Sequence, residues 1–375
     1  MSMEYHFSDL FTWTSGKPVT PTEGNIPIYG SNGIIGYSDK AKYHNRIILG
    51  RVGAYCGSVA YCPVGFDATD NTLITTCDTT KILYSYAYFL LKQFNLNGYA
   101  GGAAQPLITQ GLLKHLKCNV PAIDQQQRIV DHLSTYDNLI EVNSKRIKVL
   151  EQMAENLYKE WFVRFRFPGH ETAEFENGIP KGWHIRRIDE IGEVVGGGTP
   201  STEHPEYWHG DIPWLTPADL ASFKDVFISN GSTFITAEGM KKSSTKLLPK
   251  DTVLLSSRAP IGYVAIAKNS ICTNQGFKSV ICNTNLVMPF YLFFFFKNNK
   301  ELLEGYASGS TFLELSGGRL KRIKLIIPPL DIQTLFYNAV HSWLKQTDVL
   351  SQMNRNLIRQ RDLLLPRLMS GKLEV

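Results

Sequence analysis

The sequence predicts an α+β protein with an internal tandem repeat: two β-rich α/β heads separated by two long helices that pair as an antiparallel coiled coil. Three observations predict this class. Two stretches show an unbroken heptad pattern, the segments around them match each other at a fixed offset, and the segments before them contain short strand-like runs. The predicted parts are a first head (1–121), a first helix (122–165), a linker (166–181), a second head (182–328) and a second helix with a tail (329–375).

The first heptad stretch runs from Asp124 to Trp161, and its seam positions recur at alternating steps of four and three residues. A second stretch, Asp331 to Leu368, repeats these steps with a less pure seam. The seam positions are Ile129, Leu133, Tyr136, Ile140, Asn143, Ile147, Leu150, Ala154, Leu157 and Trp161 in the first copy, and Phe336, Val340, Trp343, Thr347, Leu350, Asn354, Leu357, Arg361, Leu364 and Leu368 in the second. Both stretches predict long helices.

The ends of these helices also carry signals. Prolines precede both stretches, so Asp124 and Asp331 are expected to be N-caps. Gln127, three residues after Asp124, would complete a capping box. Pro366 lies inside the second seam and is expected to end or kink the helix near Leu365, which leaves Leu368 doubtful as a seam residue.

Asn143 and Asn354 predict the direction of pairing. Asn143 lies two residues before the centre of its seam and Asn354 two residues after its own. In an antiparallel pair the two amides face each other, whereas a parallel pair sets Asn143 against Leu350. A buried amide that faces leucine costs about 1–3 kcal/mol. The pattern therefore favours an antiparallel pair, although seam asparagines also set register in many other coiled coils.

The tandem repeat is seen most clearly with a shift of 207 residues, which brings Tyr99 onto Tyr306 and Lys114 onto Lys321. The same shift places Arg51 on Arg258. Nearer the start of each head the offset changes, which indicates an insertion of about twenty residues in the second head. Expected strands are 46–49, 72–76, 252–256, 263–267 and 278–281, and expected helices are 82–94 and 288–303.

Composition describes an ordinary globular chain with a net charge of +5, which is a weak indication of a polyanionic partner. Residues 1–10 contain no export signal, and the most apolar run, 289–296, is too short to cross a membrane. We therefore expect a cytoplasmic protein with reduced thiols and no membrane contact.

Motifs for catalysis are missing. No acidic residue is followed two positions later by lysine, neither Gly-Lys pair continues to Ser or Thr, and no Asn-Pro-Pro or Asp-Pro-Pro run is present. The histidines and cysteines lack metal-site spacing, and Gly196–Gly198 is more typical of a turn than of a phosphate loop. We expect no catalytic residues, no metal and no cofactor in this chain.

The heads instead carry polar loops, punctuated by glycine, with aromatic and basic members. Asn, Gln and Arg bond to base edges in the major groove, while Ser and Thr position phosphates. A Gly-Asn loop is also typical of a hairpin turn, and a lone arginine of a solvated surface charge. Candidate DNA contacts are Tyr29, Ser31, Asn32, Tyr37, Arg51, Asp70 and Asn71 in the first head, and Thr199, Ser201, Trp214, Thr216, Ser257, Arg258, Asn274 and Gln275 in the second.

Several stretches together resemble the specificity subunit of type I restriction-modification systems, and the order of parts matches along the whole chain. They are 26–37 in the first head, 196–201 and 211–214 in the second, the boundaries 120–128 and 327–333, and the tail 361–373.

The resemblance implies that each head is a target recognition domain for one half of a split, asymmetric sequence in double-stranded DNA. It also implies that the helices dock two modification subunits, which methylate adenine, and that two restriction subunits join them for ATP-dependent cleavage. The chain itself would be non-catalytic. Candidate docking residues on the helices are Arg128, Lys145, Arg146, Arg355 and Arg359.

Helix length is expected to act as a ruler for the gap between the half-sites, which must lie about one helical turn apart for both heads to address one face of the DNA. The alternative interpretation is a coiled-coil scaffold whose heads bind proteins or glycans, and the modest charge is its main support.

Overall fold

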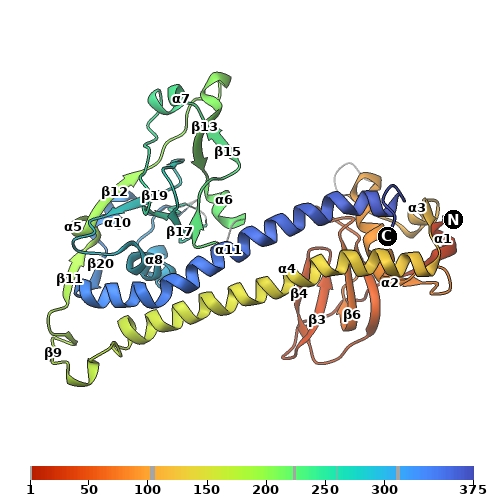
Figure 1. Ribbon diagram of the computed structural model, residues 1–375, viewed down its shortest axis with the longest axis horizontal. Coiled ribbons are helices and arrows are strands. Elements are labelled where there is room, and N and C mark those ends of the chain that lie inside the picture. The colour runs from red at the N-terminus through yellow and green to blue at the C-terminus, as the bar shows by residue number, and fades with distance from the viewer. Residues whose placement is uncertain (1, 102–105, 223–224, 259, 310–312) are drawn as a thin grey trace. The chain divides into compact units, whose positions relative to one another are not determined.

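The computed structural model describes residues 2–101, 106–222, 225–258, 260–309 and 313–375 (Figure 1). It divides into two compact units, residues 1–141 with 354–375, and residues 142–353. Each unit contains one head together with a segment of each long helix. The two units are described separately.

In the first unit, the head is built on a six-stranded sheet in the order β2-β7-β5-β6-β3-β4. Helix α2 (Tyr84–Gln93) lies against β5 and β6, and a strand pair β1–β8 closes the head next to the long helix. The strands are β1 (Met3–His6), β2 (Phe11–Ser15), β3 (Ile26–Gly30), β4 (Gly33–Ser38), β5 (Tyr43–Gly50), β6 (Val59–Ala68), β7 (Thr72–Cys77) and β8 (Lys117–Val120), with short helices α1 (Phe7–Leu10), η1 (Leu96–Tyr99) and α3 (Gln110–Lys114).

In the second unit, the head has a five-stranded sheet, β12-β19-β16-β17-β14, and a three-stranded sheet, β15-β13-β18. The strand pair β11–β20 repeats β1–β8, since His184 pairs with Ile327 as Met3 pairs with Val120. The strands are β9 (Phe175–Glu176), β10 (Ile179–Pro180), β11 (His184–Arg187), β12 (Gly192–Gly196), β13 (Trp208–Leu215), β14 (Phe227–Ile228), β15 (Thr233–Ile235), β16 (Val253–Leu255), β17 (Val264–Ala267), β18 (Cys272–Thr273), β19 (Lys278–Cys282) and β20 (Lys324–Ile327).

The helices of this head are short, and one expectation about them is corrected. The sequence predicts a single helix over 288–303, but the structure has two, separated at Asn299, whose side-chain Nδ2 donates to the carbonyl oxygen of Phe295 at 2.8 Å. Such a side-chain bond competes with continuation of the helix. The helices are α5 (Ile188–Ile191), α6 (Pro217–Ser222), α7 (Ala237–Lys241), α8 (Pro289–Asn298), α9 (Lys300–Gly305) and α10 (Gly317–Arg322), with η3 (His170–Thr172) and η4 (Pro205–Tyr207).

The two long helices are α4 (Ile123–Tyr158), which continues into a π-helical turn (Lys159–Val163), and α11 (Leu330–Met369). In the first unit they run antiparallel, because Asp137 of α4 pairs with Arg361 of α11, whereas the later Ile140 accepts a hydrogen bond from the earlier Asn354. In the second unit, the end of α4 meets the start of α11, where the rings of Tyr158 and Phe336 lie 6.1 Å apart. The predicted direction is therefore confirmed within each unit. That Asn143 faces Asn354 remains a prediction, because these residues belong to different units.

The predicted N-caps are wrong by two positions. Helix α4 begins at Ile123 and α11 at Leu330, so Asp124 and Asp331 lie inside the first turn. Gln127 forms no capping box, and its side chain donates to Asp131 at 2.7 Å.

The helix starts are instead fixed by two buried glutamines at repeat-equivalent positions. Gln126 accepts from the Leu83 amide at 2.9 Å and donates to the carbonyl oxygens of Lys81 and Pro121, both at 2.8 Å. Gln333 accepts from the Met288 amide at 2.8 Å and donates to Leu286 and Pro328. Both side chains therefore join the long helix to the head that precedes it.

Pro366 was expected to end or kink its helix, and the first of these two expectations is wrong. Helix α11 continues to Met369, and Leu368 is 2% exposed in the core of the first unit. Burying a leucine contributes about 1.5–3 kcal/mol, which offsets much of the roughly 3 kcal/mol cost of an internal proline. Leu368 is therefore buried at the end of α11, in the same core cluster as Ile129 and Leu133 of α4.

Across the described ranges, no helix has the length and apolar composition needed to cross a bilayer.

Candidate nucleic-acid interface

In the first head, the tip of the β3–β4 hairpin is fastened to two neighbouring loops. The Ser31 hydroxyl donates to the carbonyl oxygen of Asn71 at 2.6 Å, and the Ser31 carbonyl accepts from the Ser58 hydroxyl at 2.7 Å. The backbone amide of Arg51 donates to the same Asn71 carbonyl at 2.9 Å. The structure thus brings Ser31, Asn32, Arg51 and Asn71 together, and their contact with DNA remains a prediction. Asn32 and Asn71 are exposed there, with amides available to a ligand.

A cavity of about 230 Å³ lies beneath this tip, lined by Tyr29, Tyr55 and Ser58 among others. Tyr29 packs edge-on against Phe66 and is half-buried. Burial first, and then the nearby Cys62 thiol, raise the pKa of Tyr29 to about 12, so its hydroxyl stays protonated. Tyr29 therefore lines the cavity, and its neutral hydroxyl can donate a hydrogen bond.

The other two candidates of this head lie differently. Tyr37, on β4, pairs with Pro27 near the opposite end of the hairpin from its tip, and is 49% exposed. Asp70 is exposed in the turn between β6 and β7, beside Asn71.

The assumed equivalence of Arg51 and Arg258 is wrong by one position. In the first head, the Gly50 amide donates to the Ser58 carbonyl oxygen. In the second head, the Ser256 amide donates to the Tyr263 carbonyl oxygen in the same way, so Ser256 is the repeat equivalent of Gly50. Arg258 then matches Val52, and each forms a β-bridge, Val52 with Leu107 and Arg258 with Glu314. A constant shift misses this because the segment between the loop and its partner strand differs in length between the repeats.

In the second head, two polar loops meet beside the start of β19. The Thr199 hydroxyl donates to Gln275, and the Ser257 amide and hydroxyl both donate to the Gly276 carbonyl, at 2.7 and 3.0 Å. Asn274 accepts the Gly276 amide at 2.8 Å through its side-chain oxygen. These contacts bring together four candidates, Thr199, Ser257, Asn274 and Gln275, and a fifth, Arg258, follows Ser257 in the chain.

Gly197 allows the backbone of the first loop to lie directly against that of the second. A Cβ atom at this position would lie 2.0 Å from the Asn274 carbonyl oxygen, so only glycine permits the approach. The sequence predicted a turn at these glycines, but Gly196 ends β12 and Gly197 allows the backbone to pass close to Asn274.

Three candidates of the second head have internal roles. Trp214 is 6% exposed, and its indole donates to the Gly198 carbonyl at 2.9 Å. Ser257 is fully buried. Thr216 bonds through its amide and hydroxyl to Asp219, both at 2.8 Å. Burial opposes ionisation of Asp219, but hydrogen bonds from Thr216 and Ser232 hold its pKa below the usual range. These side chains shape the loops from beneath.

Ser201 lies apart, exposed in the segment that follows the glycines. Its hydroxyl accepts the Glu203 amide at 3.3 Å, and its carbonyl accepts the Trp208 indole at 3.1 Å.

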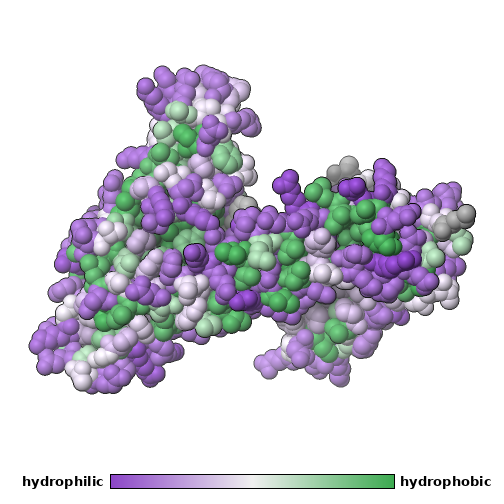
Figure 2. All heavy atoms as spheres, in the orientation of Figure 1, coloured by the Kyte–Doolittle hydropathy of each residue, from purple (hydrophilic) through white to green (hydrophobic). Residues whose placement is uncertain are grey.

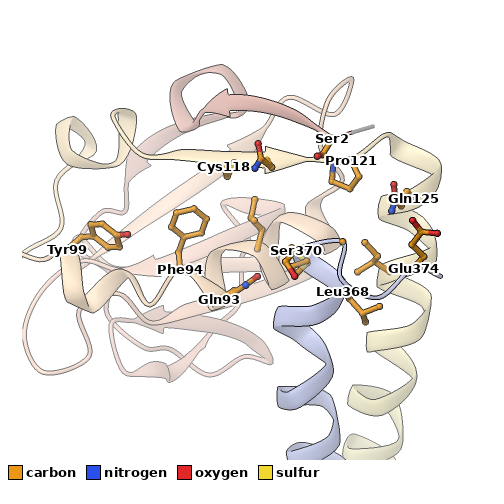
Figure 3. Close-up of a pocket in the computed structure, with 15 residues that line it drawn as sticks. Ser2, Gln93, Phe94, Tyr99, Cys118, Pro121, Gln125, Leu368, Ser370 and Glu374 are labelled. Carbon is orange, nitrogen blue, oxygen red and sulfur yellow. The ribbon is translucent and has the colours of Figure 1, made fainter.

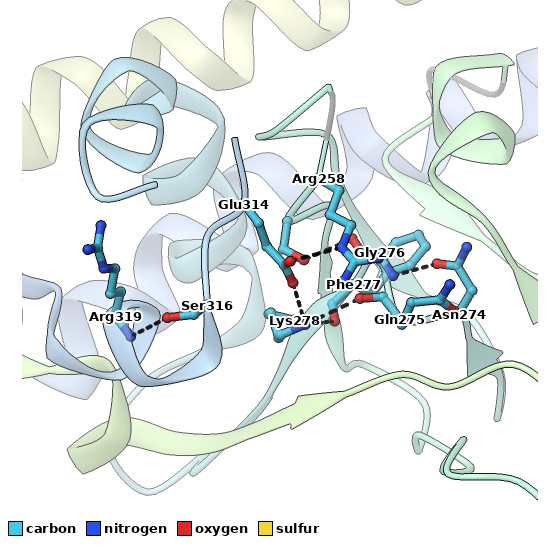
Figure 4. Close-up of polar contacts among 10 residues, drawn as sticks. Arg258, Asn274, Gln275, Gly276, Phe277, Lys278, Glu314, Ser316 and Arg319 are labelled. Atoms are coloured by element: carbon cyan, nitrogen blue, oxygen red, sulfur yellow. Dashed lines mark hydrogen bonds and ion pairs between the residues drawn. The ribbon is translucent and has the colours of Figure 1, made fainter. Parts of the chain in front are cut away.

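Two charged residues that the sequence did not single out complete this cluster (Figure 4). Glu314 bridges Arg258, at 3.0 Å from its Nε, and Lys278, at 3.6 Å from its Nζ. Lys278 also donates to the Gln275 carbonyl at 3.2 Å. No local pattern marks these residues, because Glu314 lies 56 positions after Arg258 and 36 after Lys278, and the β-bridge between Arg258 and Glu314 brings them together.

A larger cavity of about 620 Å³ lies elsewhere in the first unit, between α2, β8 and the end of α11 (Figure 3). Its lining includes Phe94, Tyr99, Leu368 and Glu374, and none of the predicted DNA contacts. Cys118 also lines it, and burial raises the pKa of this thiol to about 12. In the second unit, aromatic rings pack between α8 and the long helices, with Phe162 and Phe336 at 5.0 Å. The first unit therefore has a cavity next to the end of α11, whereas in the second unit aromatic rings pack against the end of α4.

Within the ranges that the structure describes, no group of three or more His, Cys, Asp or Glu side chains is arranged to hold a metal ion.

The comparison that decides the family concerns both repeats. A family model described as the type I restriction modification DNA specificity domain matches residues 7–152 and again residues 180–358. The chain belongs to this family. Both matches cover a head and part of the helix that follows, which is the repeat seen in the fold.

Curated relatives and a solved structure agree with this membership. The specificity subunit of the type I restriction enzyme MjaIX of Methanocaldococcus jannaschii is 42% identical over 209 residues, 53% of this chain and 48% of that protein, so the match spans about half of its length. The HindI specificity subunit of Haemophilus influenzae is 26% identical over 72% of this chain and 71% of that protein. The crystal structure of a type I restriction-modification S subunit from M. genitalium has a TM-score of 0.64 at 18% identity, covering 98% of this chain and 96% of that one, and it shares the fold.

Proposed function

We propose that this chain is the DNA-recognition subunit of a type I restriction-modification complex, without catalytic activity of its own. Each head would bind one half of an asymmetric, bipartite target in double-stranded DNA. The observation that carries the proposal is the family match over both repeats, each of which includes a head with a cluster of base-capable side chains. The chain would act in the cytoplasm, where it would meet DNA and the partner subunits.

The contacts within the heads support distinct half-sites. The first head presents Asn32 and Asn71 beside a small cavity, whereas the second presents Gln275 and a cluster of charges. Amides of Asn and Gln suit the adenine edge, and Arg suits guanine. Because the two clusters differ in chemistry, the two half-sites would differ in sequence.

The helices would dock the modification subunits, two per complex, and these would recruit two restriction subunits. In an antiparallel pair, the residues that come one position before the seam residues of one helix lie on the same side of the pair as the corresponding residues of the other helix. The partner helix runs in the opposite direction, so its preceding residues turn toward the same side. In the second unit this face exposes Val142, Val149 and Met153 of α4, and Val349 and Met353 of α11. Apolar surface is visible along the long helices in Figure 2. Exposed apolar faces of this kind are typical of protein interfaces.

Among the predicted docking cations, Arg128 and Arg146 also lie one position before a seam residue and are exposed. Lys145, Arg355 and Arg359 are exposed on other faces of the helices. We therefore propose a docking surface centred on apolar side chains, with the cations around it. The scaffold alternative, with heads that bind proteins or glycans, is not favoured by the family membership.

The test of recognition is the pattern of methylated adenines in cells with and without this chain. We expect one bipartite motif with two different half-sites that disappears when the chain is deleted. An unchanged pattern would refute the proposal.

The test of docking is co-purification with the modification subunit. Val149→Asp with Met153→Asp should weaken assembly about 30-fold or more, because burying an unpaired carboxylate costs at least about 2 kcal/mol. Gln152→Asp, at an exposed position of the same helix outside this face, is the matched control. Equal loss in the control and the double variant would contradict the assignment of the face.

A further inference from the structure

In the second head, Glu314 makes ion pairs with two cations beside the polar loops (Figure 4). Its Oε2 lies 3.0 Å from Arg258 Nε, and its Oε1 lies 3.6 Å from Lys278 Nζ. The backbone holds this arrangement independently of the charges. Glu314 forms β-bridges with Arg258 and with Ser308, and the next amide, that of Leu315, donates to the Ser257 carbonyl at 2.8 Å. These backbone contacts therefore position the Glu314 carboxylate next to Arg258 and Lys278.

These charges directly adjoin the side chains proposed to contact DNA. Lys278 donates to the carbonyl oxygens of Gln275 and Phe277, at 3.2 and 3.3 Å. The side chains of Arg258, Glu314 and Lys278 are 48%, 33% and 17% exposed, so an approaching ligand reaches Arg258 first. A duplex that contacts Gln275 would therefore come close to Lys278 and its ion-pair partner.

A carboxylate and a phosphate compete for the same partners. Both present oxygen acceptors to guanidinium and ammonium groups, and arginine binds either with similar geometry. With Glu314 in place, the cluster has a net charge of +1 instead of +2. A phosphate that bound Arg258 Nε in place of Glu314 would have to break this ion pair.

The first head lacks this device, so the fold does not require it. The positions that match Arg258, Glu314 and Lys278 by strand pairing and β-bridges are Val52, Leu107 and Leu73. All three are apolar. The charged cluster is thus a property of the second head alone.

We propose that Glu314 is an internal competitor for the DNA backbone that limits the sequence-independent affinity of the second head. This inference rests on the proposed DNA-binding function. A phosphate must displace the carboxylate from Arg258, which weakens binding to every duplex alike and leaves base contacts to decide where the chain stays bound.

The expected size follows from counterion release. One additional cation available to phosphate steepens the dependence of log K on log salt by about 0.9. If variant and wild type bind equally at 1 M salt, the variant without the carboxylate binds about 8-fold more tightly at 0.1 M. The gain should be the same for duplexes with and without the target sequence.

The experiment compares wild type with Glu314→Gln in salt titrations of duplex binding by the full chain with its modification subunit. Glutamine keeps the shape and the backbone bridges but removes the charge. The matched control is Glu174→Gln, which removes one carboxylate from an ion pair with Lys181 (2.7 Å) in the segment between α4 and the second head. Thermal unfolding of both variants is measured first, to check that each is folded.

A steeper salt dependence and tighter binding in Glu314→Gln, but not in Glu174→Gln, would support the proposal. Adding Arg258→Gln should then reverse the gain. Unchanged affinity and slope would overturn it while leaving the proposed function intact. Weaker binding by a folded Glu314→Gln would also overturn it, because the carboxylate would then act as a base acceptor, for example from cytosine N4. If wild type binds no duplex, the proposed function fails as well.

Discussion

Replacing Gln126 by alanine is a direct test of how the first head is joined to the long helix. The side chain is fully buried and makes three hydrogen bonds, to the Leu83 amide, the Lys81 carbonyl and the Pro121 carbonyl. Alanine removes all three bonds. The Leu83 amide and the two carbonyl oxygens then lose the side chain that satisfies them at the joint between the head and α4.

The size of the effect follows from these contacts. Each neutral hydrogen bond contributes about 1 kcal/mol net, and a donor left buried and unsatisfied costs about 1–3 kcal/mol. We therefore expect Gln126→Ala to lower the free energy of unfolding of the first unit by about 3 kcal/mol. For a unit of this size that corresponds to a fall in Tm of about 6–12 °C.

Hydrogen exchange read by mass spectrometry separates the two units, which a single melting curve does not. Amides of β7 should lose protection in Gln126→Ala, while those of β16 and β19 should not. Gln333→Ala should show the reverse pattern, because Gln333 makes the equivalent bonds in the second unit. Gln127→Ala is the control, since this exposed side chain bonds only to Asp131 among the described residues, and its loss should cost less than about 0.5 kcal/mol. A loss below about 1 kcal/mol in Gln126→Ala, or equal losses in both units, would refute the reasoning.

Three further predictions concern the coiled coil and one buried carboxylate. Changing either Asn143 or Asn354 to leucine should destabilise the chain in denaturant, whereas changing both should stabilise it; equal effects of single and double changes would contradict facing amides. Lengthening both helices by one turn should widen the gap in the methylated motif without altering its half-sites; an altered half-site with an unchanged gap would contradict the ruler. Because the pKa of Asp219 is lowered in the folded state, its stabilising contribution is present above the unfolded pKa, about 3.9, and is lost as pH falls through the folded value. The difference in unfolding free energy between wild type and Asp219→Asn should therefore shrink below about pH 4, and a gap that widens there would be inconsistent with this sign.

Much of the architecture could be predicted from local patterns. The heptad steps predicted both long helices because a packed helix must place an apolar residue on the same face every three or four positions. The antiparallel direction followed from the placement of two polar seam residues. The predicted helix ends were less accurate. Helix α11 continues past Pro366 because the burial of Leu368 offsets much of the cost of the proline, and this balance cannot be read from the local sequence.

The candidate DNA contacts remain a prediction, but the structure shows which of their loops meet and which side chains are buried. Loops around Ser31 and Asn274 do converge with their partners, because strand ends in one sheet lie side by side. Trp214 and Ser257 carry polar groups that suit DNA contacts, yet both are buried. Exposure depends on how the sheets pack against each other, which a residue type alone does not reveal.

The sequence by itself determined the repeat, the two helices and the family, because periodicity and motif order are properties of neighbouring residues. Only the tertiary structure decided that Arg258 matches Val52, that Gln126 joins a head to its helix, and that Glu314 meets Arg258 and Lys278. These contacts join residues far apart in the chain. They form because hydrogen-bonded strands and buried amides must be satisfied together, and that condition is met only in the folded whole.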